Sequence, residues 1–168
     1  MKKIGIISDT HGYLHPKAFS FFEPCDEIWH AGDIGNSDVL DQLSMIAPVK
    51  AVFGNCDDWD VRALTSECLI FPCEEHKVVL MHIVGYPGKY DFRTIDIIKQ
   101  EQPTILVAGH SHILKVMHDP KNKLFFINPG AAGKQGIHTR VTFLRFDISG
   151  KELSNMEIYD EPRSSRHA

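Results

Sequence analysis

The sequence predicts an α/β fold in which two facing β-sheets have helices outside them. In the first two thirds of the chain, short apolar runs alternate with helix-like segments, which is typical of parallel strands joined by crossovers. After His112, apolar runs are separated by turn-forming stretches, which indicates antiparallel hairpins. A sheet that begins with parallel strands and finishes as a meander most simply forms two facing sheets.

Five apolar runs are predicted to be the parallel strands. They are residues 2–8 (KKIGIIS), 27–32 (EIWHAG), 49–54 (VKAVFG), 77–82 (KVVLMH) and 104–109 (TILVAG). Between them, Ser37 or Asp38 can cap a helix that continues to about Ala47. Asp91 can cap a second helix over residues 92–102, which Pro103 ends.

Four later runs are predicted to form the hairpins, at residues 113–119, 124–128, 139–148 and 153–160. The stretches DPKNK and SGK supply turns between them. At 168 residues the chain is long enough for one domain with a full core, and no repeat or linker marks a boundary. We therefore expect a single domain over residues 1–162. The end of the chain, EPRSSRHA, is polar, and we expect it to fray, with a tail over residues 163–168.

Charge and composition exclude several classes of protein. The formal net charge is −4 and no lysine or arginine cluster offsets it locally, so stable nucleic-acid binding is not expected. The apolar stretch near the start is interrupted by Asp9, too early for a signal peptide, and no segment approaches the length of a membrane span. We expect a cytoplasmic protein. Its four cysteines form no CxxC pair and, apart from Cys56, are interpreted as small packed residues.

Each of the five parallel-type runs ends at or just before a potential metal ligand. In open α/β sheets, ligands bind beyond the carboxyl ends of the strands, so these side chains should gather at one edge. Each one alone has a plainer interpretation as a turn former or packed residue, but convergence from five separate runs favours a metal centre. The seven donors are Asp9, His11, Asp33, Asn55, His82, His110 and His112.

Seven donors are more than one catalytic ion uses. A first-row divalent ion takes at most about six ligands, and a catalytic ion must leave room for water. Two ions roughly 3.5 to 4 Å apart need a shared ligand, and a carboxylate with two oxygens suits that role best. Asp33 is the expected bridge, because Asp9 is tied to His11 by spacing. Carboxylate, amide and imidazole ligands without thiolate suit Mn, Fe, Co, Ni or Zn better than Ca or Mg, and Mn is the first choice.

The order of these motifs resembles that of a known family. The motifs are Asp9-x-His11, Gly32-Asp33, Gly54-Asn55-x-Asp57, His82, Gly109-His110-Ser111-His112 and Asn128-Pro129-Gly130-Ala131. They resemble the calcineurin-like metallophosphoesterases, and the last motif resembles a segment of the compact YfcE-like branch. The resemblance implies a four-layer αββα sandwich of two mixed sheets flanked by helices, and hydrolysis of phosphate esters. It also implies that one ion is held by Asp9, His11, Asp33 and His112, and the other by Asp33, Asn55, His82 and His110.

The expected substrate is a small-molecule phosphate ester, with phosphodiesters favoured by the resemblance to the compact branch. A hydroxide that bridges the two ions would attack phosphorus in line, without a phosphoenzyme. Asn55, Cys56 and Asp57 form the expected catalytic segment, with Asp57 as an acceptor that orients a ligand. Cys56 stands where larger family members have a histidine that is thought to assist the leaving group. A thiol replaces imidazolium poorly, so poor leaving groups should react slowly; alternatively, Cys56 simply fits a tight space.

Other residues near the motifs carry weaker signals. Ile83 replaces the glycine that commonly follows the histidine of the family, which bears on substrate contacts in the loop after it. That loop contains Gly85, Pro87 and Gly88, which indicate a flexible rim. Tyr86, Lys89 and Tyr90 could touch substrate there or be solvated. Surface or packing roles are expected for His15, His30, His76, His118, His138 and His167.

Two other functions compete with an enzyme of this kind. One is an interaction scaffold of the same fold, as in the small subunit of the retromer coat, which has a degraded metal site. The seven retained donors favour the enzyme. The other is a metallo-β-lactamase-type hydrolase, which would normally display an HxHxDH run that this sequence lacks. The resemblance also allows a homodimer or a homotetramer, because relatives often form them.

Overall fold

The first sheet is built around strand β1, Lys2–Ile7, whose side chains are buried at its end. In the computed structural model, which describes residues 1–164, the strand order of this sheet is β12-β11-β1-β2-β3. Strands β2 (Glu27–His30) and β3 (Val49–Ala51) continue from β1 in parallel. Strands β11 (Arg140–Ser149) and β12 (Glu152–Pro162) are antiparallel neighbours on the other side. This sheet is therefore mixed.

The second sheet has the order β4-β5-β8-β10-β9. Its three central strands are parallel: β5 (His76–Met81), β8 (Ile105–Val107) and β10 (Leu124–Pro129). Strands β4 (Cys68–Cys73) and β9 (Leu114–Asp119) pair with its edges in the antiparallel sense. A separate small hairpin consists of β6 (Gly85–Tyr86) and β7 (Lys89–Tyr90).

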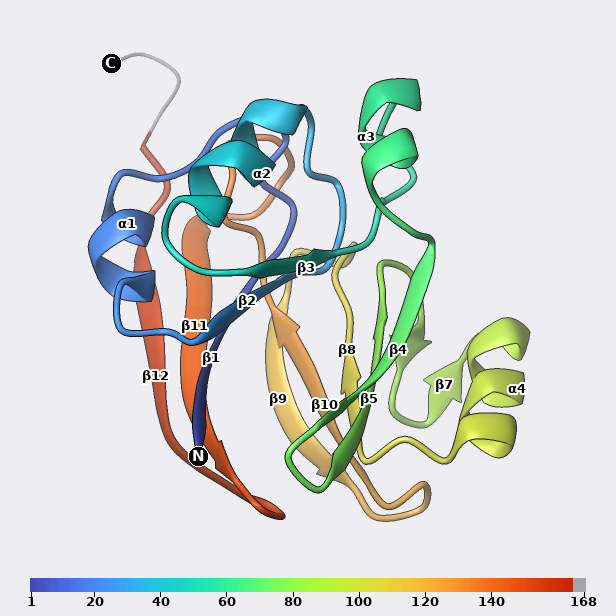
Figure 1. Cartoon of the computed structure of the whole chain (residues 1–168). Coiled ribbons are helices and arrows are strands. Elements are labelled where there is room, and N and C mark those ends of the chain that lie inside the picture. Colours follow the sequence, from blue (N-terminus) through green and yellow to red (C-terminus); the bar gives the residue numbers. More distant parts are fainter. Residues whose placement is uncertain (165–168) are drawn as a thin grey trace.

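The two sheets face each other across an apolar core, with helices on the outer sides (Figure 1). Residues of both sheets, including Ile6, Trp29 and Leu80, are fully buried in this core. Helices α1 (Lys17–Phe22), α2 (Ser37–Ser44) and α3 (Trp59–Leu64) contribute to a second cluster, with Ile28 of the first sheet. Helix α4 (Phe92–Glu101) packs Ile98 against the second sheet. The predicted four-layer sandwich of two mixed sheets is confirmed.

The helix predictions were correct in place and partly wrong at the ends. Asp91 caps α4 as predicted, because its side chain accepts from the Thr94 N–H. Helix α2 is instead capped by Asn36, whose Oδ1 accepts from the Val39 N–H at 3.3 Å. Ser37 and Asp38 are therefore the first two helical residues, and the helix ends at Ser44 rather than near Ala47.

The grouping of strands differs from the prediction. The five parallel-type runs do not share one sheet, because three lie in the first sheet and two in the second. The later strands are also divided, with β9 and β10 in the second sheet and β11 and β12 in the first. Two short helices, α1 and α3, and the edge strand β4 were missed, since six-residue segments carry little periodic signal. No helix within residues 1–164 is long and apolar enough to cross a membrane.

The end of the chain is more ordered than expected up to Arg163. Glu161 and Pro162 belong to β12 rather than to a frayed tail. The Arg163 N–H donates to Thr139 O at 2.8 Å, and its guanidinium donates to Gly136 O at 2.6 Å. Residues 165–168 of the predicted tail lie outside the described residues.

Candidate metal centre

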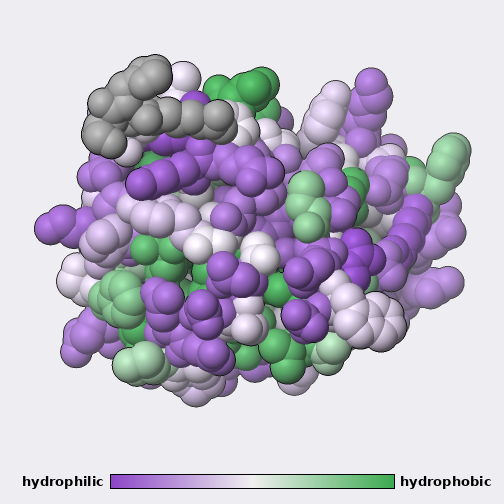
Figure 2. All heavy atoms as spheres, turned by 90° about the horizontal axis from the view of Figure 1, so that it is seen from above, coloured by the Kyte–Doolittle hydropathy of each residue, from purple (hydrophilic) through white to green (hydrophobic). Residues whose placement is uncertain are grey.

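All seven predicted ligands lie in loops at the carboxyl ends of parallel strands. Asp9 and His11 follow β1, Asp33 follows β2 and Asn55 follows β3, all in the first sheet. His82 follows β5, and His110 and His112 follow β8 in the second sheet. Figure 2 views the molecule from this end, where hydrophilic residues cover much of the surface. The loops of two facing sheets, rather than one edge of one sheet, form the site.

The backbone at these positions is unusual. Nine non-glycine residues of the described chain have positive φ, and five of them are predicted ligands, namely Asp9, His11, Asp33, His110 and His112. Positive φ is uncommon outside glycine and costs free energy, so it persists where the surrounding structure enforces it. Strained backbone therefore concentrates at the predicted ligands.

One group of ligand atoms consists of Asp9, His11 and His112, whose donor atoms lie within 4.8 Å of one another. Asp9 is fully buried, and its Oδ2 accepts hydrogen bonds from Ser8 Oγ at 2.6 Å and His110 N at 3.1 Å. Its other oxygen, Oδ1, is buried with no hydrogen-bond partner among the described residues. The Nε2 atoms of His112 and His11 lie 3.1 and 3.9 Å from this oxygen. An unpaired buried carboxylate oxygen next to imidazole nitrogens suits a cation.

A second group consists of Asp33, His82 and His110. His82 Nδ1 donates to Ala31 O at 2.7 Å, because a carbonyl can only accept. That bond leaves Nε2 of the neutral ring without a hydrogen and directed into the site. Nε2 lies 3.2 Å from Asp33 Oδ2 and 3.1 Å from Asn55 Oδ1. Asn55 thus joins this group, as the predicted second ligand set requires.

Asp33 lies between the two groups. Its Oδ2 is 3.2 Å from His82 Nε2 and 3.7 Å from His11 Nε2, while its Oδ1 accepts from the Cys56 N–H at 2.9 Å. Burial raises the pKa of this carboxyl, but the nearby His82 ring, the Cys56 N–H and the charge of His11 lower it to about 2. One oxygen thus faces both groups, which is the arrangement that a bridging ligand needs.

The charges of the centre are mutually dependent. Burial raises the pKa of Asp9, but contact with His112 and the charge of His82 outweigh it, so the pKa is lowered overall. Burial lowers the pKa of His82, but the carboxylates of Asp33 and Asp9 outweigh it, so that pKa is raised. Two buried carboxylates thus need positive charge beside them, which imidazolium or metal ions can supply.

Asp57 holds two of the loops together. Its Oδ2 accepts from the N–H groups of Gly54 at 2.8 Å and Ile34 at 3.1 Å, and its Oδ1 accepts from Gly35 N–H at 2.9 Å. Asp57, expected to be an acceptor that orients a ligand, accepts from the backbone beside Asp33 and Asn55. Its place in the expected catalytic segment stays a prediction.

Gly54 allows the closest approach of these loops. A Cβ at this position would lie 2.1 Å from Asp33 Oδ1 and 2.5 Å from the Asp33 backbone nitrogen. Only glycine lets the loop after β3 pass so close to the predicted bridging carboxylate.

Cys56 is exposed and lines the centre. Its Sγ belongs to a third group of donor atoms with His11 and Asp33, and Asn55 Nδ2 lies 3.6 Å from it. Burial and the negative charge of Asp33 raise the pKa of the thiol. The sulfur therefore faces the centre as a neutral thiol, a weak hydrogen-bond donor.

Several contributors were missed or underrated from the sequence. His30 is fully buried, accepts from Gly32 N–H at 3.1 Å through Nδ1 and contacts Thr10 Oγ1 at 3.0 Å through Nε2. Burial lowers its pKa to about 4. Asn128 donates to Gly109 O at 3.0 Å and to Ser111 Oγ, which fixes the turn that carries His110.

His138 was expected to have a surface or packing role, and the structure places it against His112. Its Nδ1 lies 3.1 Å from His112 Nδ1, and its Nε2 lies 2.8 Å from Gly133 O. No spacing in the sequence connects His138 with His112. The one available signal was that His138 lies in a loop that contains glycine. Of the other histidines, His15 contacts Glu161, His76 contacts Thr104, and His118 is exposed beside Phe125, while His167 lies outside the described residues.

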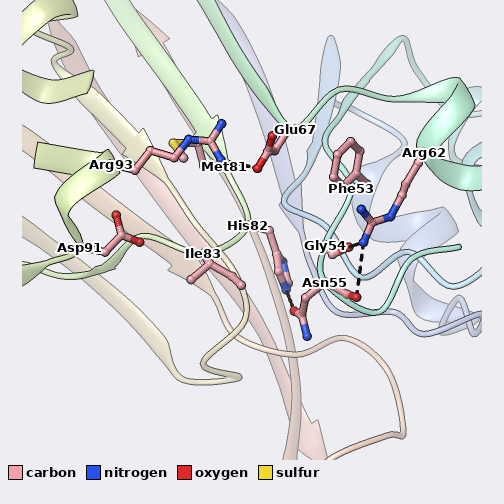
Figure 3. Close-up of a pocket in the computed structure, with 10 residues that line it drawn as sticks. All are labelled: Phe53, Gly54, Asn55, Arg62, Glu67, Met81, His82, Ile83, Asp91 and Arg93. Atoms are coloured by element: carbon pink, nitrogen blue, oxygen red, sulfur yellow. Dashed lines mark hydrogen bonds and ion pairs between the residues drawn. The ribbon is translucent and has the colours of Figure 1, made fainter. Parts of the chain in front are cut away.

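The predicted ligands border two depressions. A cleft of about 170 Å³ is lined by His11, Asp33, Asn55, Cys56, His110, His112, Gln135 and Gly136. A neighbouring pocket of about 300 Å³ shares Asn55 and also contacts His82 (Figure 3). In the close-up, Arg62 points to the backbone of Gly54 and Asn55, while Arg93 pairs with Glu67. The smaller cleft thus opens onto five of the seven predicted ligands, and the larger pocket lies beside it.

The predicted rim is a hairpin rather than an irregular loop. Tyr90 donates from its hydroxyl to Asp119 at 2.9 Å and packs in the core of the second sheet, so it anchors the hairpin. Tyr86 is half exposed and lies beneath the Lys115 ammonium. Ile83 lines the pocket next to His82.

Comparison with known proteins shows the family of the chain. The profile of the Calcineurin-like phosphoesterase superfamily domain matches residues 1–151. A probable metallophosphoesterase of Methanothermobacter thermautotrophicus is 31% identical over 137 residues, which cover 76% of this chain and 76% of that protein. One from Methanocaldococcus jannaschii is 32% identical over 134 residues, which cover 76% of this chain and 67% of that protein.

Solved structures share the fold at lower identity. Vps29 of Chaetomium thermophilum has a TM-score of 0.76 at 15% identity, over 98% of this chain and 99% of that one. A structure described as a novel archaeal phosphodiesterase has a TM-score of 0.73 at 22% identity, over 94% and 99%. These two likenesses concern the fold alone. With the profile match and the two archaeal relatives, the chain belongs to the calcineurin-like phosphoesterase superfamily.

Proposed function

We propose that this protein hydrolyses phosphate esters, with diesters preferred, by means of two divalent transition-metal ions. The observation that carries the proposal is the position of Asp33 Oδ2, which faces His11 of one ligand group and His82 of the other. A carboxylate oxygen between two sets of donors supports two ions with a shared ligand. Mn is the first choice of metal, with Ni, Co, Fe or Zn as alternatives for this donor set.

The two groups support the predicted division of ligands. Asp9, His11, Asp33 and His112 would hold one ion, and Asp33, Asn55, His82 and His110 the other. Bound there, the ions would supply an activated water at neutral pH and positive charge for the phosphate oxygens. The chain itself contributes fixed orientation: the Ala31 carbonyl fixes the ring of His82, and Ser8 with the His110 N–H fixes Asp9.

Two features support diesters and activated esters over simple alkyl monoesters. The residue between Asn55 and Asp57 is a neutral thiol, which protonates a leaving group poorly. A pocket of about 300 Å³ next to Asn55 and His82 offers room for a second substituent on phosphorus. The attacking group in this proposal is a water that the ions would activate, so no phosphoenzyme is expected.

The test is an activity panel of phosphomonoesters and diesters, run with Mn, Ni, Co, Zn and Mg. We expect turnover with transition metals, best on aryl diesters, and a fall of at least about 100-fold in Asp33→Asn, because an amide cannot bridge two cations as a carboxylate does. Asp38→Asn, at an exposed position in the first turn of α2, is the matched control and should keep full activity. An unimpaired Asp33→Asn enzyme contradicts the bridge.

The scaffold alternative is tested by metal titration of the same protein. A scaffold should bind no pair of ions tightly and should gain no activity when metal is added. The cytoplasmic location and the homodimer or homotetramer stay predictions from the sequence.

A further inference from the structure

We infer that His138 is a positioning residue that fixes which ring nitrogen of His112 faces the metal centre. The inference rests on the proposed function, in which His112 is a metal ligand. It concerns a residue in the loop before β11, which contributes no donor atom to either predicted ligand set.

The first step is the hydrogen on His138. Its Nε2 lies 2.8 Å from Gly133 O, and a carbonyl oxygen only accepts, so Nε2 carries the hydrogen and donates. The neutral ring then has its lone pair at Nδ1. This lone pair points at His112 Nδ1, 3.1 Å away, with the two rings edge to face at a centroid separation of 4.9 Å.

The second step is the hydrogen on His112. Because His138 Nδ1 accepts, His112 Nδ1 carries a hydrogen and donates it. The Nε2 atom of a neutral His112 ring is then free of hydrogen, and it is this atom that lies 3.1 Å from the unpaired Asp9 Oδ1. His112 thus presents Nε2, and not Nδ1, as its ligand atom.

The contacts form a closed circuit with Asp9. The Gly133 N–H donates to Asp9 O at 3.0 Å, so the carbonyl that accepts from His138 belongs to a residue bonded to the Asp9 backbone. From Asp9 the circuit runs through Gly133, His138 and His112 and returns to Asp9 Oδ1. Each link limits the position of His112 relative to the carboxylate with which it would share an ion.

The loop around His138 is built to hold this contact. A Cβ at Gly136, whose φ is +125°, would lie 2.5 Å from His112 Nδ1 and 3.1 Å from His138 Nδ1. Only glycine lets the backbone cover the edge where the two rings meet. The Arg163 guanidinium donates to the carbonyls of Gly136 and Lys134 and so ties the loop to the end of β12.

His138 is poorly placed to bind an ion itself. Both of its nitrogens are engaged, one by Gly133 and the other by His112. The same device occurs on the other side of the centre, where Ala31 O accepts from His82 Nδ1 and leaves Nε2 to face Asp33. One ligand histidine is thus oriented by a backbone carbonyl and the other by a second histidine.

The first measurement is metal affinity, by calorimetric titration of metal-free protein with Mn²⁺ or Zn²⁺. In His138→Leu we expect one of two ions to bind about 10- to 100-fold more weakly and the other to change by less than about 3-fold, since outer hydrogen bonds to ligand histidines have effects of this size. His138→Asn keeps an acceptor near the position of Nδ1 and should recover most of the loss. His118→Leu, at an exposed histidine on β9, is the control.

The second measurement is the ¹H–¹⁵N NMR spectrum of histidine side chains in the Zn²⁺-loaded protein. We expect the His112 Nδ1–H to be protected from exchange in wild type and in His138→Asn, and to lose this protection in His138→Leu. The inference alone would be overturned if wild type binds two ions tightly and His138→Leu binds them equally well. It would also be overturned if the spectrum of wild type places the hydrogen of His112 on Nε2. Failure of wild type to bind two ions would instead overturn the proposed function.

Discussion

At the residue scale, the centre is held in a conformation that the chain does not favour by itself. Asp9, His11, Asp33, His110 and His112 all have positive φ. Such residues cost roughly 1 kcal/mol or more each, and the bonds of Ser8, Asp57 and Asn128 to these loops offset that cost. In return, these bonds hold the donor-bearing loops in one arrangement, which limits the ordering that metal binding requires.

Cys56 allows the proposed preference for good leaving groups to be tested. In Cys56→His, an imidazolium would replace a neutral thiol that lines the cleft beside Asp33. We expect turnover of alkyl esters to rise about 10- to 100-fold, with little change for aryl esters, because only poor leaving groups need a proton in the transition state. Steady-state kcat/KM on both classes measures this, and Cys56→Ser is the control. Equal gains on both classes, or no gain, would favour the view that Cys56 simply fits its space.

His30 predicts a pH dependence of stability. Burial lowers its pKa to about 4, while an unfolded histidine has a pKa near 6.5, so the unfolded state binds more protons between these values. Protonation of Nδ1 would also break the bond that this atom accepts from Gly32 N–H. His30 therefore contributes fully to the free energy of unfolding above about pH 7, and this contribution is lost as the pH falls toward 4. At pH 5 the loss is about 2 kcal/mol. In urea unfolding of metal-free protein, the free energy of unfolding should depend less on pH in His30→Gln than in wild type. The same pH dependence in both proteins would refute this prediction.

At the element scale, the site is made by loops that belong to different strands, and Asp57 fastens two of them. Its carboxylate accepts from Ile34, Gly35 and Gly54, so the loops after β2 and β3 share one anchor. Asp33 and Asn55 are 22 positions apart in the sequence (55 − 33). The shared anchor explains how they keep one orientation relative to His82.

Asp57→Asn should therefore weaken both the fold and the centre. An amide puts a donor where a backbone N–H already donates, and a buried unpaired group costs about 1–3 kcal/mol. We expect a lower free energy of unfolding by that amount, together with weaker binding of the ion near Asn55. Urea unfolding and metal titration measure the two effects. Asp60→Asn, exposed in the first turn of α3, should change stability by less than about 0.5 kcal/mol.

Sequence patterns predicted elements better than their pairing. The apolar runs and the Asp91 cap were correct because burial and capping are local properties that follow periodicity. The division of five parallel-type runs between two sheets could not be inferred, since it depends on contacts between distant residues such as Ile6 and Leu80 in the common core. For the same reason the sequence indicated the donors but not the contact of His138 with His112, because no spacing in the sequence connects these two residues.

At the scale of the whole molecule, the centre joins the two sheets at one end. Each proposed ion takes ligands from both: Asp9, His11 and Asp33 with His112, and Asp33 and Asn55 with His82 and His110. Away from this end, apolar packing such as that of Trp29 against Phe71 joins the sheets. Metal binding should therefore stabilise the packing of sheet against sheet, beyond its effect on the loops alone.

Metal addition should accordingly raise the stability of the entire chain. An ion that binds only the folded state stabilises it by about 2.7 kcal/mol when its free concentration is 100 times Kd. We expect one cooperative thermal transition that moves upward on adding Mn²⁺ and returns on chelation, and a smaller shift in Asp33→Asn, which loses the ligand that both ions share. Calorimetry with and without chelator measures the shift, and amide hydrogen exchange locates it. If backbone amides in both β1 and β5 gain protection from exchange, the ions stabilise the packing of one sheet against the other. If protection is confined to the loops and the midpoint of the thermal transition does not change, metal binding does not contribute to that packing.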